Sequence, residues 1–281
     1  MKPPWLKSRI PSGPRYQHLK SMFRELGLHT VCEEARCPNV ADCWNRQTAT
    51  LMIMGDICTR SCGFCAVTTG RPLPLDAKEP EHVAEAISQL HLKHVVITSV
   101  DRDDLPDGGS AHFARTIELL KQHCPQTQIE VLIPDFKGRR EDLQRVFAAA
   151  PHILNHNIET VPSLQAQVRP QARYERSLQV LRWAAEAGLI AKSGIMLGLG
   201  EADEEVATTI KDLRTEGHIS ILTLGQYLQP TDKHLPVQRY VPPEEFESWK
   251  SYAESLGIPS VASGPMVRSS YHADEAAQPW R

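Results

Sequence analysis

The fold is decided by residues 50–65, which read Thr50-Leu-Met-Ile-Met-Gly-Asp-Ile57-Cys58-Thr-Arg-Ser-Cys62-Gly-Phe-Cys65. The first half is a short apolar run typical of a buried strand. Three cysteines follow it at once. Ligands in parallel α/β folds bind at the carboxyl ends of the strands. The stretch therefore predicts a strand that ends in a ligand-binding loop.

The same pattern recurs along the chain. Further apolar runs of strand length occupy residues 94–100, 128–133, 153–158, 190–197 and 220–226. Segments whose apolar residues recur at helical spacing lie between or after them, as in Val83, Ile87 and Leu90. The last such segment, residues 243–256, begins with proline and has Gly257 beyond its end, as helices often do.

Six consecutive β-then-α units predict an α/β fold with a parallel sheet covered by helices. Right-handed crossovers would make it a barrel or a doubly wound sheet, and periodicity alone leaves both open. We predict three parts. They are an N-terminal arm with cysteines (residues 1–48), the β/α part (residues 49–257) and an irregular C-terminal tail (residues 258–281).

Composition excludes several classes of protein. The 281 residues are 41% hydrophobic and 23% charged, which is ordinary for a chain with a large core. A net charge of 31 − 34 = −3 excludes a broadly basic nucleic-acid binder. There is no apolar run of the roughly 18 residues that a membrane span needs, nor the apolar core of a secretory signal at the start. We expect a cytoplasmic protein, although an organelle matrix would also fit.

The cysteines point to a metal. Six of the seven lie between Cys32 and Cys65, and the seventh, Cys124, is expected to be a small buried residue. Clustered cysteines in a chain without an export signal indicate reduced thiols rather than disulfides. They form two arrays, which are Cys32-Glu-Glu-Ala-Arg-Cys37-Pro-Asn-Val-Ala-Asp-Cys43 and Cys58-x3-Cys62-x2-Cys65.

Three thiolates on one tight loop suit an iron–sulfur cluster. Three ligands for four irons leave one iron open to a small chelating molecule, as an open zinc position is open to substrate. The alternative is a zinc site. Zinc usually takes four ligands in pairs, and His82, His91 or His94 would then have to supply the fourth.

The second array, after a first strand and with Phe64 before its last cysteine, resembles the radical S-adenosylmethionine (SAM) superfamily. The first array, together with Arg268-Ser-Ser-Tyr271, is similar to the lipoyl synthase family, and the likeness extends from Lys2 to His272. It implies a partial (β/α)6 TIM-like barrel with N-terminal and C-terminal extensions covering its mouth.

The resemblance also implies two 4Fe-4S clusters. The SAM-binding cluster would be held by Cys58, Cys62 and Cys65. The auxiliary cluster would be held by Cys32, Cys37, Cys43 and a serine oxygen, with Ser270 preferred over Ser269 although little separates them. A serine oxygen is a poorer iron ligand than a thiolate, which suits a cluster that must give up sulfur. A plain polar tail is the alternative.

Contacts to SAM are implied at several strand ends. Phe64 would lie near the adenine, or else only pack the loop. Asn157 and Glu159 share one face at the end of a strand, where a carboxylate could bind ribose hydroxyls. The remaining candidates are Thr98 and Ser99 after the second strand, Gly194 and Ile195 in the glycine-rich strand, and Arg169 and Arg173 for the SAM carboxylate unless they are surface residues. Gln226 could line a substrate channel.

The implied reaction is the insertion of two sulfur atoms at C6 and C8 of an octanoyl group, with the auxiliary cluster as sulfur donor. Aliphatic C–H bonds are not acidic, so radical cofactor chemistry is required. A reduced cluster would split SAM into methionine and a 5′-deoxyadenosyl radical, which would take the hydrogen atoms.

The resemblance implies three kinds of partner. They are octanoylated lipoyl carrier domains (2-oxoacid dehydrogenase E2 subunits and the glycine cleavage H protein), a reductant such as ferredoxin or flavodoxin, and an iron–sulfur carrier that rebuilds the cluster. Basic residues of the arm, Lys2, Lys7, Arg9 and Arg15, could meet an acidic partner or simply aid solubility. A biotin-synthase-like enzyme and a zinc-binding interaction module are the competing hypotheses.

Overall fold

A computed structural model describes residues 3–6, 13–34, 37, 39–45, 48, 50–90 and 92–280, except for the side chains of residues 14, 15, 41 and 45. The chain forms two compact units. The N-unit comprises Ser8–Arg60 and Ala66–His152. The C-unit comprises Met1–Lys7, Ser61–Cys65 and Ile153–Arg281. Each unit is described by itself.

The N-unit alternates strands and helices. Its elements are α1 (Pro14–Glu25), β1 (His29–Thr30), α2 (Val31–Glu34), α3 (Val40–Asn45), β2 (Thr50–Ile53), β3 (Ile57–Cys58), β4 (Thr68–Thr69), α4 (Glu79–Leu90), β5 (His94–Ser99), α5 (Ser110–His123), β6 (Gln128–Leu132), η1 (Phe136–Gly138) and α6 (Arg140–Ala148). Strands β2, β5 and β6 pair in parallel, and β1 pairs antiparallel with β2. β3 and β4 form a separate parallel pair.

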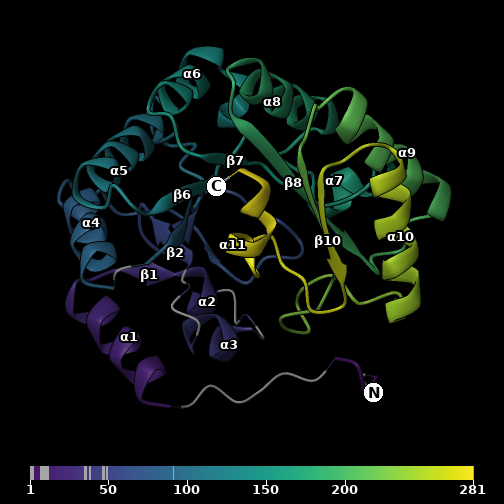
Figure 1. Cartoon of the computed structure of the whole chain (residues 1–281), viewed down its shortest axis with the longest axis horizontal. Coiled ribbons are helices and arrows are strands. Elements are labelled where there is room, and N and C mark those ends of the chain that lie inside the picture. The colour runs from purple at the N-terminus through teal and green to yellow at the C-terminus, as the bar shows by residue number, and fades with distance from the viewer. Residues whose placement is uncertain are drawn as a thin grey trace. The chain divides into compact units, whose positions relative to one another are not determined.

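Helices cover this sheet because their apolar stripes need burial. Figure 1 shows α4, α5 and α6 side by side. Val83 and Ile87 of α4, Ile117 of α5 and Leu143 of α6 are fully buried. Because both faces of a parallel sheet are packed, its strands are nearly continuous apolar runs, and all four residues of β2 are buried.

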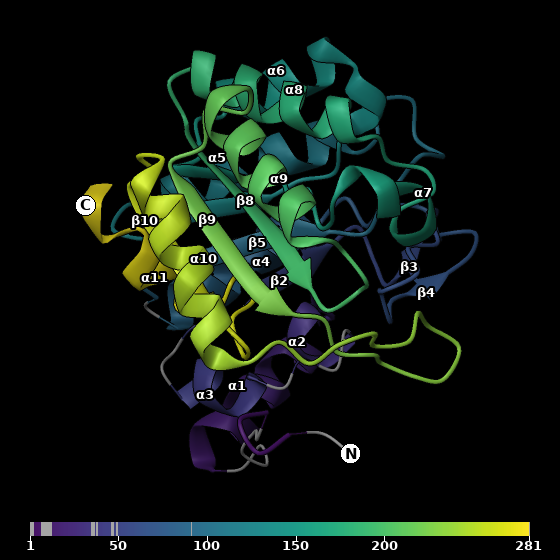
Figure 2. The same ribbon diagram turned by 90° about the vertical axis from the view of Figure 1, so that its right-hand side faces the viewer.

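The C-unit continues the same alternation. Its elements are β7 (Ile153–Asn155), η2 (Pro162–Leu164), α7 (Gln165–Val168), α8 (Tyr174–Glu186), β8 (Ile190–Leu197), α9 (Asp203–Thr215), β9 (Ile221–Gln226), α10 (Pro243–Ser255), β10 (Ser260–Gly264), α11 (Ala273–Ala276) and η3 (Gln278–Trp280). All four strands pair in parallel in the order β7-β8-β9-β10. Figure 2 shows α9 and α10 lying across β8 and β9.

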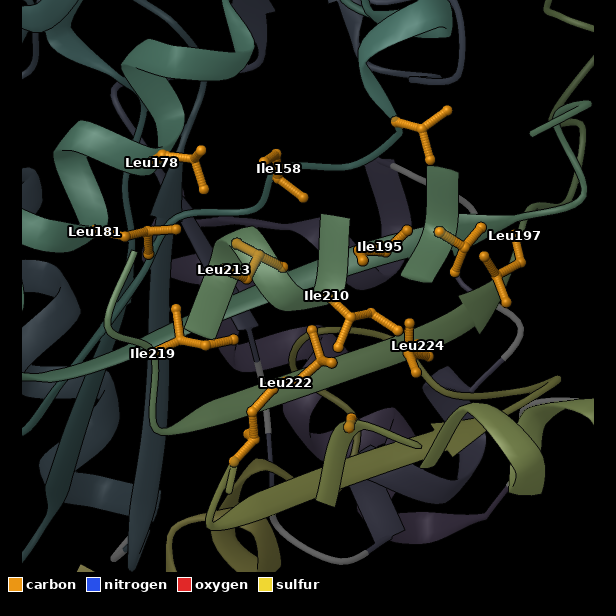
Figure 3. Close-up of a cluster of buried hydrophobic side chains, with 14 of the residues drawn as sticks. Ile158, Leu178, Leu181, Ile195, Leu197, Ile210, Leu213, Ile219, Leu222 and Leu224 are labelled. Atoms are coloured by element: carbon orange, nitrogen blue, oxygen red, sulfur yellow. The ribbon is translucent and has the colours of Figure 1, made fainter. Parts of the chain in front are cut away.

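The core of the C-unit is the layer between sheet and helices. Figure 3 shows Ile195 and Leu197 of β8 and Leu222 of β9 pointing toward Ile210 and Leu213 of α9. All belong to one cluster of buried side chains, and Ile195 is 3% exposed. The cluster fixes the strands, so the residues at the ends of these strands have defined positions.

Most predicted elements are confirmed, with shifts at their ends. The strand predicted over residues 50–57 stops at Ile53, because Met54 and Gly55 take positive φ angles of 69° and 90°. The strand predicted over residues 153–158 stops at Asn155, and Glu159 then makes a single bridge to Ile195 of β8. The helix predicted over residues 243–256 is α10.

The prediction of an irregular tail is wrong in part. Residues 260–264 form β10, which pairs with β9 from Ser260 opposite Ile221 to Gly264 opposite Gly225. The strand was missed because its sequence, Ser-Val-Ala-Ser-Gly, has no apolar run, and all five residues are only half-buried. The sheet edge offered by β9, rather than hydrophobicity, makes this segment a strand.

Candidate active site

Cys58 lies in β3 of the N-unit, where main-chain groups hold its sulfur. The Sγ atom accepts hydrogen bonds from the backbone N–H groups of Arg60 (3.4 Å) and Asp101 (3.3 Å). Burial, followed by the negative charge of Asp101, raises the pKa of this thiol. Hydrogen bonds to cluster sulfurs are one of the means by which proteins set the properties of iron–sulfur sites. The surroundings of Cys58 therefore suit a metal ligand.

Arg60 carries a buried charge network beside Cys58. Its guanidinium is 4% exposed and binds Asp103 through Nε (2.8 Å) and Nη2 (3.0 Å). The same Nη2 donates to Asp135, whose side chain is fully buried, at 2.7 Å, and Nε lies 3.3 Å from Asp101. Burial acts to lower the pKa of Arg60, but the three carboxylates outweigh it and raise the pKa. The network ties the loop after β3 to the loops after β5 and β6.

The first cysteine array lies on α2 and α3 of the N-unit and between them. The backbone N–H of Cys37 donates to the carbonyl of Cys32 (3.1 Å), and the N–H of Thr48 donates to the carbonyl of Cys43 (2.9 Å). Burial, and next the neighbouring Cys37, raises the pKa of the Cys32 thiol to about 12. Metal binding would have to displace that proton.

An aromatic group anchors this array to α1. Trp44 of α3 is fully buried. Its ring stacks on Tyr16 at a centroid distance of 4.9 Å and meets the edge of Phe23 at 5.8 Å. The position of Cys43, next in sequence to Trp44, is therefore set by the packing of α3 on α1.

None of the six array cysteines forms a disulfide within the described part of the chain. No three His, Cys, Asp or Glu side chains in the described part of the chain gather as a site for a single metal ion. Cys124 is buried at 7% exposure, which confirms the prediction for it.

The loop Ser61–Cys65 of the C-unit is held on both sides by backbone hydrogen bonds. Gly63 donates to Val168 (2.9 Å) and accepts from the N–H of Leu235 (3.0 Å). A Cβ on Gly63 would lie 3.0 Å from the Leu235 side chain, so this close approach favours glycine. His234 Nε2 lies 2.9 Å from the carbonyl of Cys65, which adds a contact at the end of the loop.

Phe64 packs against the buried cluster of Val168, Leu199 and Tyr227. The packing alternative for this residue is therefore what the structure shows within the C-unit. A contact with adenine remains a prediction. Phe64 and the backbone bonds of Gly63 together hold the loop between Cys62 and Cys65 in place.

Asn157 and Glu159 are brought together at the end of β7. Asn157 Nδ2 donates to Glu159 Oε1 at 3.0 Å and to Ser269 Oγ at 3.3 Å. Loss of water raises the pKa of Glu159 above its usual value, against the lowering effects of Arg169 and Asn157. Gly194 of β8 lies beside them, because a Cβ there would be 2.9 Å from Asn157 Oδ1 and 2.6 Å from Thr223 Oγ1.

One buried polar atom at this strand end has no hydrogen-bond partner in the described part of the chain. Asn157 is 8% exposed, and its Oδ1 has no hydrogen-bond partner among the described residues. Buried polar groups are normally paired, so an orphaned oxygen is a reason to expect a bound molecule. An unpartnered acceptor beside the Glu159 carboxylate fits a polar ligand such as SAM.

The two candidate arginines differ. Arg169 is buried, and its Nη1 donates to the carbonyls of Asn157 (2.8 Å) and Ile158 (3.3 Å), so it supports the strand end. Arg173 is exposed at the start of α8 and makes no ion pair within the described ranges. Of the two, Arg173 has the free guanidinium that a carboxylate would need.

Several other residues predicted to contact SAM or substrate already form hydrogen bonds or pack in the core. Thr98 Oγ1 donates to Leu132 O at 2.9 Å, whereas the buried Ser99 Oγ has no partner in the described part of the chain. The side chain of Ile195 is in the core. Gln226 bonds to four backbone groups, including Arg239 O (3.0 Å) and Val241 N–H (2.8 Å), and so holds the loop after β9.

In the C-terminal motif, Ser269 and Ser270 have different surroundings. The hydroxyl of Ser269 accepts from Asn157, whereas that of Ser270 has no hydrogen bond to any described residue.

Sequence reasoning missed Arg60, Asp101 and Asp135 as a network. The run of charges over residues 101–104 after a strand was the available signal. The predictions for Lys2, Lys7 and Arg9 lie outside the described residues, as does that for the side chain of Arg15.

The cysteine loop and the β/α fold define a radical SAM enzyme. A family model described as the radical SAM superfamily matches residues 52–213, and one described as the N-terminal domain of lipoyl synthase matches residues 1–37. Among solved structures, methylornithine synthase has a TM-score of 0.58 at 14% identity and covers 87% of this chain and 74% of its own. SuiB of Streptococcus suis, with SAM bound, has a TM-score of 0.56 at 12% identity over 77% of this chain and 50% of its own. These likenesses confirm the predicted fold class.

Curated relatives of much higher sequence identity indicate which family within this class the chain belongs to. The lipoyl synthase of Rubrobacter xylanophilus is 56% identical over 99% of this chain and 87% of its own length. Those of Thermus thermophilus and Bacteroides fragilis are 53% and 54% identical over 97% and 98% of this chain, and over 85% and 95% of their own lengths. The chain belongs to the lipoyl synthase family, so it is an enzyme. No helix among the described residues is long and apolar enough to cross a membrane.

Proposed function

We propose that this chain inserts two sulfur atoms at C6 and C8 of an octanoyl group carried by a lipoyl carrier domain. The observation that carries the proposal is the pair of three-cysteine arrays in a chain 56% identical to a lipoyl synthase over 99% of its length. One array supports radical generation and the other a source of sulfur. Neither alone would account for sulfur insertion at an unactivated carbon.

The donor sets suit two 4Fe-4S clusters. Cys58, Cys62 and Cys65 would hold the cluster that binds SAM, and Cys32, Cys37, Cys43 and Ser270 would hold the auxiliary cluster. When bound, the clusters supply the electron that cleaves SAM and the sulfur that enters the product. The free hydroxyl of Ser270 supports its choice over Ser269, whose hydroxyl is engaged by Asn157.

The side chains around SAM have distinct tasks in this proposal. Glu159 accepts hydrogen bonds from the ribose hydroxyls, and Asn157 Oδ1 accepts one where it is now unpartnered. Gly194 lets the Asn157 side chain approach β8 closely, and Ser99 offers its unpaired hydroxyl. Arg173 pairs with the carboxylate of the methionine part. Phe64 shields the adenine side, whereas Thr98 and Ile195 contribute through their backbone positions.

The chain's larger task is exclusion of water and of side reactions. A deoxyadenosyl radical in a loose site would attack the protein itself, so substrate and SAM must be held closely. The predicted covering of the barrel mouth by both extensions serves this need. The further partners are a small electron-transfer protein, such as ferredoxin or flavodoxin, and an iron–sulfur carrier, all in the cytoplasm.

The test is anaerobic reconstitution followed by an assay on an octanoyl-lysyl peptide with SAM and a reductant. The wild-type protein should hold about eight irons, since each 4Fe-4S cluster holds four. It should also form the lipoyl peptide. The Cys37→Ala variant should cleave SAM but insert no sulfur, whereas Cys124→Ala should do both. Full sulfur insertion by Cys37→Ala would refute the role of the first array. Colourless protein loaded with zinc would support the interaction module instead.

A further inference from the structure

The C-terminal serine turn, residues 268–271, begins with its backbone close to strand β9 of the C-unit. Within the turn, the N–H of Tyr271 donates to the carbonyl of Arg268 at 2.9 Å. Just before it, the carbonyl of Val267 lies so close to β9 that a Cβ on Gly225 would collide with it. The turn therefore begins with its backbone pressed onto the sheet, where side chains of neighbouring strand ends can reach it.

Asn157 is the strand-end side chain that reaches it. The carboxylate of Glu159 accepts hydrogen bonds, so it selects the orientation in which the Asn157 NH2 group faces it, at 3.0 Å. The second proton of that NH2 group then points to Ser269 Oγ, at 3.3 Å. Because Asn157 is 8% exposed and fixed by Glu159, its donor is already oriented for Ser269.

The two serines of the turn consequently have different roles. We propose that Ser269 is a positioning residue, which Asn157 uses to anchor the serine turn, and that this leaves the hydroxyl of Ser270 available as a ligand. The proposal rests on the proposed function for the role of Ser270, but the anchor itself does not. It also means that one asparagine serves both the SAM side and the turn that carries the auxiliary ligand.

The anchor can be tested in the full chain without any cluster. In the metal-free, reduced protein, Ser269→Ala should speed amide hydrogen exchange at Tyr271 about fivefold, which corresponds to the roughly 1 kcal/mol of one hydrogen bond. Ser269→Thr keeps the hydroxyl and should restore protection. Asn157→Ala should match Ser269→Ala, and the double variant should be no faster than either, because the two residues share one bond.

Ser260→Ala is the matched control. Ser260 Oγ donates to the carbonyl of Ala276 at 3.0 Å, so it ties α11 to β10 by a similar hydroxyl contact. Its loss should leave exchange at Tyr271 unchanged. Exchange at Tyr271 within twofold of wild type in Ser269→Ala would overturn the anchor. Faster exchange in Ser270→Ala rather than in Ser269→Ala would overturn it too, since the roles would be reversed.

Spectroscopy of the loaded protein separates this inference from the proposed function. Ser270→Ala should change the Mössbauer signal of one auxiliary iron while leaving exchange at Tyr271 in the metal-free protein unchanged. Ser269→Ala should keep that signal but lose auxiliary iron to a chelator about fivefold faster. An unchanged signal in Ser270→Ala would refute the ligand assignment alone. Iron loss at the wild-type rate in Ser269→Ala would overturn the anchor.

Discussion

Replacing Arg60 with methionine would remove the buried cation that Asp101, Asp103 and Asp135 share. The guanidinium is 4% exposed and bonds to Asp103 and Asp135 at 2.7–3.0 Å. Removing one partner of a buried ion pair costs about 3–5 kcal/mol. Asp101 and Asp103 keep 22% and 25% of their side-chain surface in water, which screens part of the loss, but Asp135 keeps none. We therefore expect a loss of about 3 kcal/mol in the free energy of unfolding.

The measurement is urea unfolding of the metal-free, reduced protein, so cluster loss does not contribute. The matched control is Arg115→Met. Arg115 pairs with Glu81 at 3.0 Å, but both side chains are about half exposed, and an exposed pair contributes far less stability than a buried one. Adding Asp135→Asn to Arg60→Met should recover part of the loss, because one buried negative charge disappears. Equal losses in Arg60→Met and Arg115→Met would refute the buried-network argument.

Three further outcomes follow from contacts within single units. Gly194→Ala should lose about 1–3 kcal/mol of stability and weaken SAM binding, because its Cβ would meet Thr223 Oγ1 at 2.6 Å. Gly70→Ala is the control. Its Cβ would have its nearest contact at 3.4 Å, so it should be nearly neutral in the same urea experiment. Gly225→Ala should push the Val267 carbonyl off β9, because the added Cβ would collide with it, and should expose residues 268–271 to limited proteolysis. An unchanged cleavage pattern would contradict this. Because the Cys32 pKa is raised to about 12, its reactive thiolate stays scarce at neutral pH. Alkylation of Cys32 in the metal-free protein, measured by mass spectrometry, should therefore keep accelerating with pH from about 8 to 11. A plateau near pH 9 would argue against this burial.

Local pattern predicted the order of elements but not their ends. The apolar runs at residues 190–197 and 94–100 become β8 and β5 almost residue for residue, since both are buried on two faces. β2 is shorter than its apolar run because Met54 and Gly55 turn the chain. β10 was missed because half-buried small residues carry no periodic signal, and pairing with β9 decides their conformation.

The site was only partly predictable for the same reason. The spacing of Cys58, Cys62 and Cys65 is local, so it can be recognised in the sequence. The contact of Asn157 with Ser269 joins residues 112 positions apart, and that of Arg60 with Asp135 joins residues 75 apart. No local rule pairs such residues. The structure also shows that the Arg169 guanidinium donates to a backbone carbonyl. Residue type alone does not tell such a structural arginine from one available to a ligand.

By itself, the order of residues determined that strands alternate with helices, that six thiols stand in two arrays, and which family the chain resembles, because periodicity and spacing act over a few neighbouring positions. Only the tertiary structure decided which polar side chains already have hydrogen-bond partners within the protein. Hydrogen bonds and burial depend on partners that folding brings from distant parts of the chain, and so Ser269 and Ser270, neighbours of identical chemistry, have different surroundings.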